Sequence, residues 1–266
     1  MPHSTAHQKL TRDQVHDAVR ASYGVVARTR NIEDKEGAAC CGPSCCGGDN
    51  RARSDYTPEE LAAVPKNAYL GEGSGVPVRH AELKPGQVVV DLGAGAGMDT
   101  FLAANAVGPA GRVHGFDMTP DMLERARRNA VAGNYAQVSF ERADIEKLPL
   151  ADRAADAAIS NCVINLAPDK PAVFREVFRV LRPGGRLSIA DIVLRGDGAA
   201  LAALRSSSTP DSWCACVSGA LDETAYLEAI RSAGFDDVQI AAERPGQIQP
   251  GGEVRAVAVT ITACKP

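Results

Sequence analysis

The eight cysteines of this sequence are the residues whose type and spacing most suggest chemistry. Four of them form two adjacent pairs among glycine, proline and polar residues, a composition typical of a loop. A chain of 266 residues can bury a core of its own, so a disulfide scaffold is a poor interpretation. Clustered thiols instead favour metal binding or redox chemistry. The cysteines are Cys40, Cys41, Cys45, Cys46, Cys162, Cys214, Cys216 and Cys264.

Structural roles for the cysteines are the alternative to chemistry, and the sequence favours one only at Cys264. Cys264 is isolated in an apolar stretch, which predicts an inert buried side chain. The compact CC-x3-CC cluster at 40–46 has no histidine beside it, whereas closed zinc sites need four ligands, usually as two separated pairs. We therefore expect no structural metal.

A glycine-rich segment at 91–97, DLGAGAG, follows an apolar stretch and could hold a cofactor. Glycine allows a sharp bend there and lets the backbone approach a ligand. A dinucleotide fingerprint, GxGxxG or GxGxxA, counted from Gly93 would end at Met98, so the spacing does not match it. Asp117 ends the next predicted strand, where a carboxylate can accept hydrogen bonds from ribose hydroxyls. The alternative is an ordinary strand–turn–helix connection with a solvated Asp117.

Predicted strands and helices alternate from Pro85 onward, which is typical of a doubly wound, mainly parallel sheet. A helix at the N-terminus and a short one from Thr57 precede them, and a last helix starts at Asp222. We predict strands at 87–92, 112–117, 138–141, 154–160, 186–193, 238–242 and 254–263, and helices at 97–107, 122–132 and 169–181.

These elements suggest three regions. Residues 1–56 are an N-terminal helix and a cysteine-rich arm, and residues 57–195 are a Rossmann-like core that binds the cofactor. Residues 196–266 contain an insertion, at 196–221, followed by the final helix and the strands that complete the sheet.

The acid-x-GxGxG pattern at 91–97 resembles the first motif of class I S-adenosylmethionine methyltransferases. The resemblance implies a Rossmann-like sheet of seven mainly parallel strands and S-adenosylmethionine as methyl donor. Asp144-Ile145 resembles the family's adenine-contact motif, and Asn161 lies where the methyl group would be presented. The cofactor-binding residues implied are Asp91, Gly93, Gly95, Gly97, Asp117, Met118, Asp144, Ile145 and Asn161.

Three further segments resemble the bacterial arsenite methyltransferases: NCVINLAPDK at 161–170, FREVFRVLRPGG at 174–185 and CVSGA at 216–220. Related small-molecule methyltransferases share the LRPGG turn but not the cysteine of NCVINL. The resemblance implies that Cys162 and Cys216 bind trivalent arsenic. It leaves Cys41 and Cys46, with their neighbours, to deliver arsenic, supply a third ligand or act as resolving thiols.

Arsenic chemistry suits thiols, because a soft acceptor prefers thiolate ligands. The arsenic lone pair is then the nucleophile, and catalysis consists chiefly of holding donor and acceptor in line. A thiol reductant such as glutathione or thioredoxin would reset the enzyme by thiol–disulfide exchange. Two alternatives stay open: methylation of a small organic acceptor, and a thiol-rich metalloid-binding protein without transferase activity.

One residue departs from the family pattern. Many members have a cysteine in the glycine-rich turn before the first strand, where we place Glu72 of this chain. That cysteine serves as a third thiol, whereas glutamate offers hard oxygen ligands and forms no disulfide. Either the N-terminal pairs replace it, or the protein methylates in fewer steps or on another substrate.

The composition excludes several partners. A net charge of −4 gives no basic footprint for nucleic acid or an anionic membrane, and no apolar run approaches the roughly 20 residues that span a bilayer. The first residues lack the apolar stretch of a signal peptide. We expect a cytoplasmic monomer.

Overall fold

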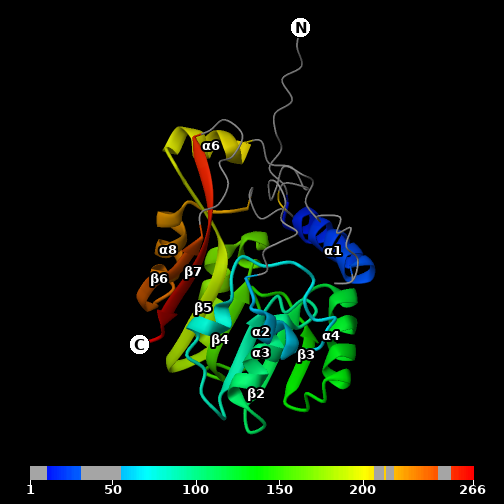
Figure 1. The fold of residues 1–266 in the computed structure, drawn as a ribbon. Coiled ribbons are helices and arrows are strands. Elements are labelled where there is room, and N and C mark those ends of the chain that lie inside the picture. The colour runs from blue at the N-terminus through cyan, green and yellow to red at the C-terminus, as the bar shows by residue number, and fades with distance from the viewer. Residues whose placement is uncertain (1–10, 31–54, 207–212, 214–218, 245–252) are drawn as a thin grey trace.

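The computed structural model describes residues 11–30, 55–206, 213, 219–244 and 253–266. Within them a seven-stranded sheet has the order β3-β2-β1-β4-β5-β7-β6, with helices on both faces (Figure 1). β7 runs antiparallel to both of its neighbours, and the other described pairs are parallel, so the predicted mainly parallel sheet is confirmed. The strands are β1 (Val88–Leu92), β2 (Arg112–Asp117), β3 (Val138–Arg142), β4 (Ala155–Asn161), β5 (Leu181–Gly196), β6 (Asp236–Arg244) and β7 (Val254–Cys264).

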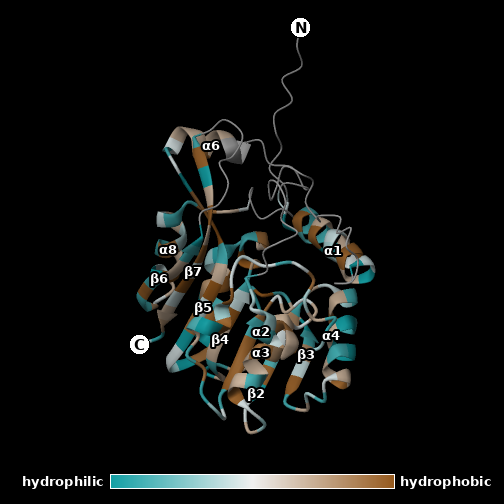
Figure 2. Cartoon of the chain, viewed as in Figure 1, coloured by the Kyte–Doolittle hydropathy of each residue, from teal (hydrophilic) through white to brown (hydrophobic). Residues whose placement is uncertain are grey.

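Two layers of helices cover the sheet. The cluster on one face combines strand residues with side chains of α5 and α8, and the cluster on the other face contains α3 and α4. Figure 2 shows the apolar residues concentrated in the strands, while α4 carries hydrophilic residues. The helices are α1 (Arg12–Thr29), α2 (Pro58–Ala62), α3 (Met98–Val107), α4 (Pro120–Ala132), α5 (Lys170–Val180), α6 (Gly198–Ser206) and α8 (Glu223–Ser232), with 3-10 turns η2 (Pro77–His80) and η3 (Ile164–Leu166).

The fifth strand is longer than predicted. It begins at Leu181, which pairs with Ala155, whereas we predicted a helix to 181 and a strand only from 186. The next pair joins Ala157 to Arg186, so residues 182–185 form an irregularity within the strand instead of preceding it. The buried Leu181 side chain and its pairing with β4 account for the earlier start.

β5 and β7 also continue beyond the rest of the sheet. β4 last pairs at Asn161 with Ala190, whereas β5 and β7 stay paired as far as Gly196 and Val254. This two-stranded extension leads into α6, a helix that our sequence prediction left out of the insertion (Figure 1).

Helix α1 lies beside α4, near the carboxyl ends of the strands (Figure 1). Thr11 caps its first turn, with Gln14 completing a capping box. Val15 and Val19 are buried against Leu166. Among the described residues, no helix is both long and apolar enough to pass through a membrane.

Candidate functional site

The turn between β1 and α3 shapes one wall of a pocket at the carboxyl ends of the strands. Gly93 and Gly95 have φ angles of +67° and +53°, in the left-handed region that favours glycine. A Cβ at Gly93 would lie 2.2 Å from Val163 Cγ2, so packing requires glycine there. A Cβ at Gly95 would meet no atom within 4 Å, because this residue faces open space on the pocket side.

Two carboxyl groups hold this turn in place. Asp117, at the end of β2, accepts hydrogen bonds from the backbone N–H groups of Gly95 at 3.0 Å and Thr119 at 2.7 Å. Asp91 in β1 accepts one from Thr100 Oγ1 at 2.5 Å. Burial raises the pKa of both aspartates, and the nearby Asp99 adds to the effect at Asp91.

Asp99, in the first turn of α3, is a site residue that the sequence analysis missed. Its Oδ2 accepts hydrogen bonds from Tyr56 at 2.7 Å and from Asn161 Nδ2 at 2.9 Å. Its Oδ1 is buried without a hydrogen-bond partner. Burial raises the pKa of Asp99 to about 6, against the lowering effect of the two donors. The sequence signal was weak, because an acidic residue in a helix's first turn is common for dipole reasons alone.

The pocket is acidic. Its lining includes five carboxyl groups but, among the described residues, no lysine or arginine. Arg12 and Arg30 pair with Asp144 and Glu72 from outside this lining, so the remaining three carboxyl groups are those that favour a cationic ligand over a pyrophosphate. The five residues are Glu72, Asp91, Asp99, Asp117 and Asp144.

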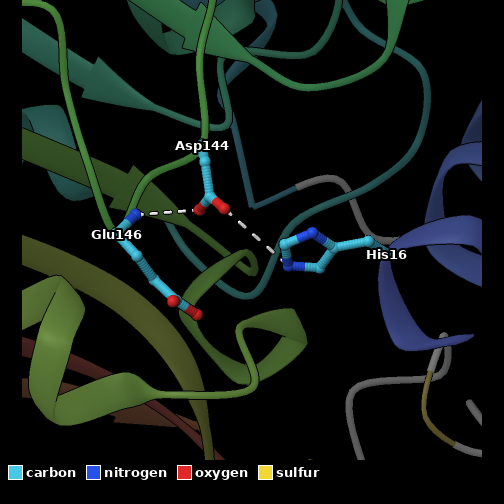
Figure 3. A group of neighbouring side chains, drawn as sticks. All are labelled: His16, Asp144 and Glu146. Carbon is cyan, nitrogen blue, oxygen red and sulfur yellow. Dashed lines mark hydrogen bonds and ion pairs between the residues drawn. The ribbon is translucent and has the colours of Figure 1, made fainter. Parts of the chain in front are cut away.

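His16, Asp144 and Glu146 form a cluster at one side of the pocket, where α1 approaches the loop after β3 (Figure 3). The His16 Nε2 lies 4.0 Å from Asp144 Oδ2. Arg12 donates to Asp144 at 2.8 Å and pairs with the buried Glu146 carboxylate at 2.6 Å. Because Arg12 already neutralises this group, we interpret it as a clamp on α1 and assign no metal to it.

Cys162 follows β4 directly, lines the same pocket and packs in the apolar cluster that includes Val15 and Val19 of α1. Its φ angle of +58° is uncommon for a residue with a Cβ. Its backbone N–H donates to Ala190 O at 2.8 Å, and its Sγ accepts a hydrogen bond from Ser74 Oγ at 3.0 Å. The thiol is therefore fixed by its backbone and by a neighbouring hydroxyl.

The residues after Cys162 are anchored to β5. Asn165 donates to both oxygens of buried Asp191, from its backbone N–H at 3.1 Å and from Nδ2 at 2.8 Å. Burial raises the pKa of Asp191 to about 6. This second asparagine of the NCVINL segment thus holds the loop that presents the thiol.

In the turn before η2, Ser74 contacts Cys162, whereas Glu72 points elsewhere. Glu72 pairs with Arg30 at the end of α1. Ser74, two residues later, makes the contact with Cys162. A third thiol able to exchange with Cys162 from this turn would therefore stand at position 74, not at position 72.

The structure brings most of the predicted cofactor residues together around the pocket. Gly97 is an exception, because it caps α3 at a φ of +101° and a Cβ there would meet Phe101 at 2.5 Å. Cys264 is half-buried on β7 near Arg186, away from the pocket. Cys40, Cys41, Cys45, Cys46, Cys214 and Cys216 lie outside the described residues. The predicted residues that line the pocket are Asp91, Gly93, Gly95, Asp117, Met118, Asp144, Ile145, Asn161 and Cys162.

Comparison with known proteins agrees with this geometry. A family model described as a methyltransferase domain matches residues 83–234. An arsenite methyltransferase from Halobacterium salinarum is 38% identical over 86% of this chain and 59% of its own length. One from Aquipseudomonas alcaligenes is 34% identical over 87% of this chain and 65% of its own.

A solved structure decides the family. The arsenic(III) S-adenosylmethionine methyltransferase from Chlamydomonas reinhardtii superposes with a TM-score of 0.62 and 31% identity, over 78% of this chain and 74% of that one. The chain belongs to the arsenite methyltransferase family. The family resemblance and fold predicted from the sequence are thereby confirmed. The chain spans about three fifths of the length of the two arsenite methyltransferases named above.

The described residues fit the methyl donor expected of this family. S-Adenosylmethionine carries a sulfonium and an ammonium but no phosphate, which suits an acidic pocket without cations. The unpartnered Oδ1 of Asp99 is a suitable acceptor for the ammonium, and the open space at Gly95 leaves room for the ligand. Asp117 keeps further lone pairs for ribose hydroxyls.

Gly95→Ala tests the placement of the cofactor, with Gly86→Ala as its matched control. Both glycines have positive φ and open space where a Cβ would stand, but Gly86 lies outside the pocket. Each substitution should cost about 1–2 kcal/mol of unfolding free energy. Only Gly95→Ala should also weaken S-adenosylhomocysteine binding, by about tenfold or more, because its methyl group enters the ligand's space. Calorimetric titration and thermal unfolding measure both, and equal affinities would contradict the placement.

Ser74→Cys and Glu72→Cys test which residue faces Cys162. With Ser74 Oγ 3.0 Å from Cys162 Sγ, a sulfur at position 74 lies within reach of a disulfide. Mild oxidation should therefore crosslink residues 74 and 162 in the first variant, as peptide mass spectrometry would show. The second variant should give no 72–162 crosslink, since the side chain at position 72 is directed towards Arg30 and Ser74 is the residue of this turn in contact with Cys162. The reverse outcome would contradict the geometry.

Proposed function

We propose that this protein transfers a methyl group from S-adenosylmethionine to thiol-bound trivalent arsenic, arsenite or methylarsenite, in arsenic detoxification. The observation that carries the proposal is the position of Cys162, a fixed thiol on the wall of an acidic pocket that lacks cationic side chains among the described residues. A soft thiol ligand for arsenic therefore lies beside a pocket suited to the cationic methyl donor.

The proposed reaction gives the carboxyl groups and the cysteines of the chain different roles. When bound, S-adenosylmethionine supplies an electrophilic methyl group on a positively charged sulfur. The carboxyl groups of Asp91, Asp99 and Asp117 favour the cation and orient it. Cys162 holds arsenic so that its lone pair faces the pocket, and Cys216 is the second ligand that the family resemblance implies. No general base is needed, because the arsenic lone pair is the nucleophile.

The electron balance requires thiols. Methylation raises arsenic formally from the trivalent to the pentavalent state, and two thiols return it to the trivalent state as they form a disulfide. We propose that Cys41, Cys46 and their neighbours take part, and that glutathione or thioredoxin reduces the disulfide. A reducing compartment keeps these thiols available, which favours the cytoplasm. We further propose that the protein acts as a monomer.

Cys162→Ser tests the acceptor assignment, with Cys264→Ser as the control. The wild-type protein, given S-adenosylmethionine, glutathione and arsenite, should form methylated arsenic, followed over time by chromatographic speciation. Cys162→Ser should lose about 100-fold or more of this activity, because a hydroxyl is a poor ligand for a soft element. Cys264→Ser should stay within about twofold, since its thiol lies away from the pocket.

Two outcomes would reject parts of this proposal. If the wild-type protein forms no methylated arsenic, the proposed activity is wrong. If Cys162→Ser is as active as wild type, the activity stands but Cys162 is not the ligand. The time course also separates arsenite from methylarsenite as the preferred substrate.

A pH titration tests the role of Asp99 in holding the donor. The pKa of Asp99 is raised to about 6, so its carboxyl is ionised at pH 7 and mostly protonated at pH 5. The ligand ammonium stays charged over this range. Affinity for S-adenosylhomocysteine should therefore fall about tenfold from pH 7 to pH 5. Asp99→Asn should bind more weakly at pH 7 and lose most of this pH dependence. An unchanged profile in the variant would assign the titration elsewhere.

A further inference from the structure

Asn161 links the pocket proposed for S-adenosylmethionine to the turn that contacts Cys162. Its Nδ2 has two N–H groups, which share three acceptors: Asp99 Oδ2 at 2.9 Å, Tyr56 Oη at 3.0 Å and Gly75 O at 2.9 Å. Its Oδ1 accepts from the Ser74 backbone N–H at 2.8 Å. The Asn161 side chain thus fixes both the Asp99 carboxylate, which lines the pocket, and the turn that carries Ser74.

Ser74 connects Asn161 to Cys162. The residue is 6% exposed, and its Oγ donates to Cys162 Sγ at 3.0 Å. Ser74 is not among the residues that line the cofactor pocket. The Ser74 hydroxyl therefore contacts the Cys162 thiol and does not line the pocket proposed for S-adenosylmethionine.

The backbone of Cys162 limits the other freedoms of the thiol. Its left-handed φ of +58° turns the residue out of β4, and its N–H is fixed on Ala190 of β5. The torsion about the Cα–Cβ bond of Cys162 then decides where the sulfur points. The hydrogen bond from the Ser74 hydroxyl favours one of its three staggered positions.

We propose that Ser74 is a positioning residue for the Cys162 thiol. Asn161 holds Ser74 in a fixed position relative to the pocket for S-adenosylmethionine. This inference rests on the proposed function. The hydroxyl keeps the Cys162 sulfur in the orientation that receives arsenic, so that binding does not have to order the side chain first. Holding a ligand atom in place before binding is a general source of affinity.

The test compares arsenite binding by three variants in reducing buffer. Ser74→Ala removes the hydroxyl, and Ser74→Cys replaces it with a thiol of similar shape. Ser188→Ala is the matched control, because Ser188 is also buried and its Oγ donates to Pro77 O at 2.8 Å, away from Cys162. Equilibrium dialysis with arsenic quantification gives the affinity.

Trp213 supplies a site-specific reporter. It is the chain's single tryptophan, and it lies in the apolar cluster that includes Cys162. Its Nε1 donates to Leu166 O at 3.1 Å, which fixes the indole near the thiol. Arsenite bound at Cys162 should therefore change Trp213 fluorescence, whereas arsenite bound at a remote thiol should not.

Ser74→Ala should weaken arsenite binding about tenfold, a factor in the range of one intramolecular hydrogen bond. Its S-adenosylhomocysteine affinity should stay within about twofold of wild type, since Ser74 does not line that pocket. Ser74→Cys should restore arsenite affinity to the wild-type value or above, which a damaged fold would not do. Ser188→Ala should match wild type in both affinities.

Three results would overturn the inference. Arsenite affinity in Ser74→Ala within twofold of wild type would show that the hydroxyl positions nothing. Equal losses in Ser74→Ala and Ser188→Ala would assign the effect to general packing. Absence of arsenite binding in the wild-type protein would reject the proposed function as well, and this result differs from the first two because the wild type itself fails.

Discussion

The hydrogen bond from Asn161 to Asp99 joins the two halves of this site. Asp99 comes from the first turn of α3 and Asn161 from the end of β4, so the contact joins these two elements in the wall of the pocket. A buried carboxyl without donors would be costly, and Tyr56 supplies the second donor to the same oxygen. With Oδ2 so occupied, Oδ1 is left for a ligand. The thiol loop depends on the same asparagine, because its Oδ1 fixes the Ser74 turn.

Helix α1 adds an outer wall to the pocket. Its apolar side chains pack with Leu166 and Cys162, which supplies most of the stabilisation expected from such a contact. Its ion pairs, Arg12 with Asp144 and Glu146, Arg28 with Asp121 and Arg30 with Glu72, are partly exposed. Pairs of that kind contribute about 0–1 kcal/mol each. Their role is therefore to fix where the helix lies over the strand ends.

The sequence predicted the parts of the molecule that rest on local pattern. The strands, the DLGAGAG turn and the thiol after β4 follow from apolar runs, glycine spacing and family-like segments. Tyr56, Asp99 and Ser74 could not be predicted in the same way. Their contacts join residues 43 to 105 positions apart, and each residue has an ordinary local explanation in a capped helix or a turn. The early start of β5 was missed because Pro183 and the glycines beside it locally favour a stop.

The contact between Ser74 and Cys162 also changes how the departure from the family pattern is understood. A serine oxygen cannot form a disulfide, so at this position the thiol receives a hydrogen bond in place of a redox partner. Glu72 is explained by its pairing with Arg30 and need not take over a thiol's role. Under the proposed function, the electrons that return arsenic to the trivalent state would then come from other cysteines of the chain or from the external thiol. The two proposals therefore assign positioning to Ser74 and reduction to other thiols, whereas one cysteine in this turn could combine both roles.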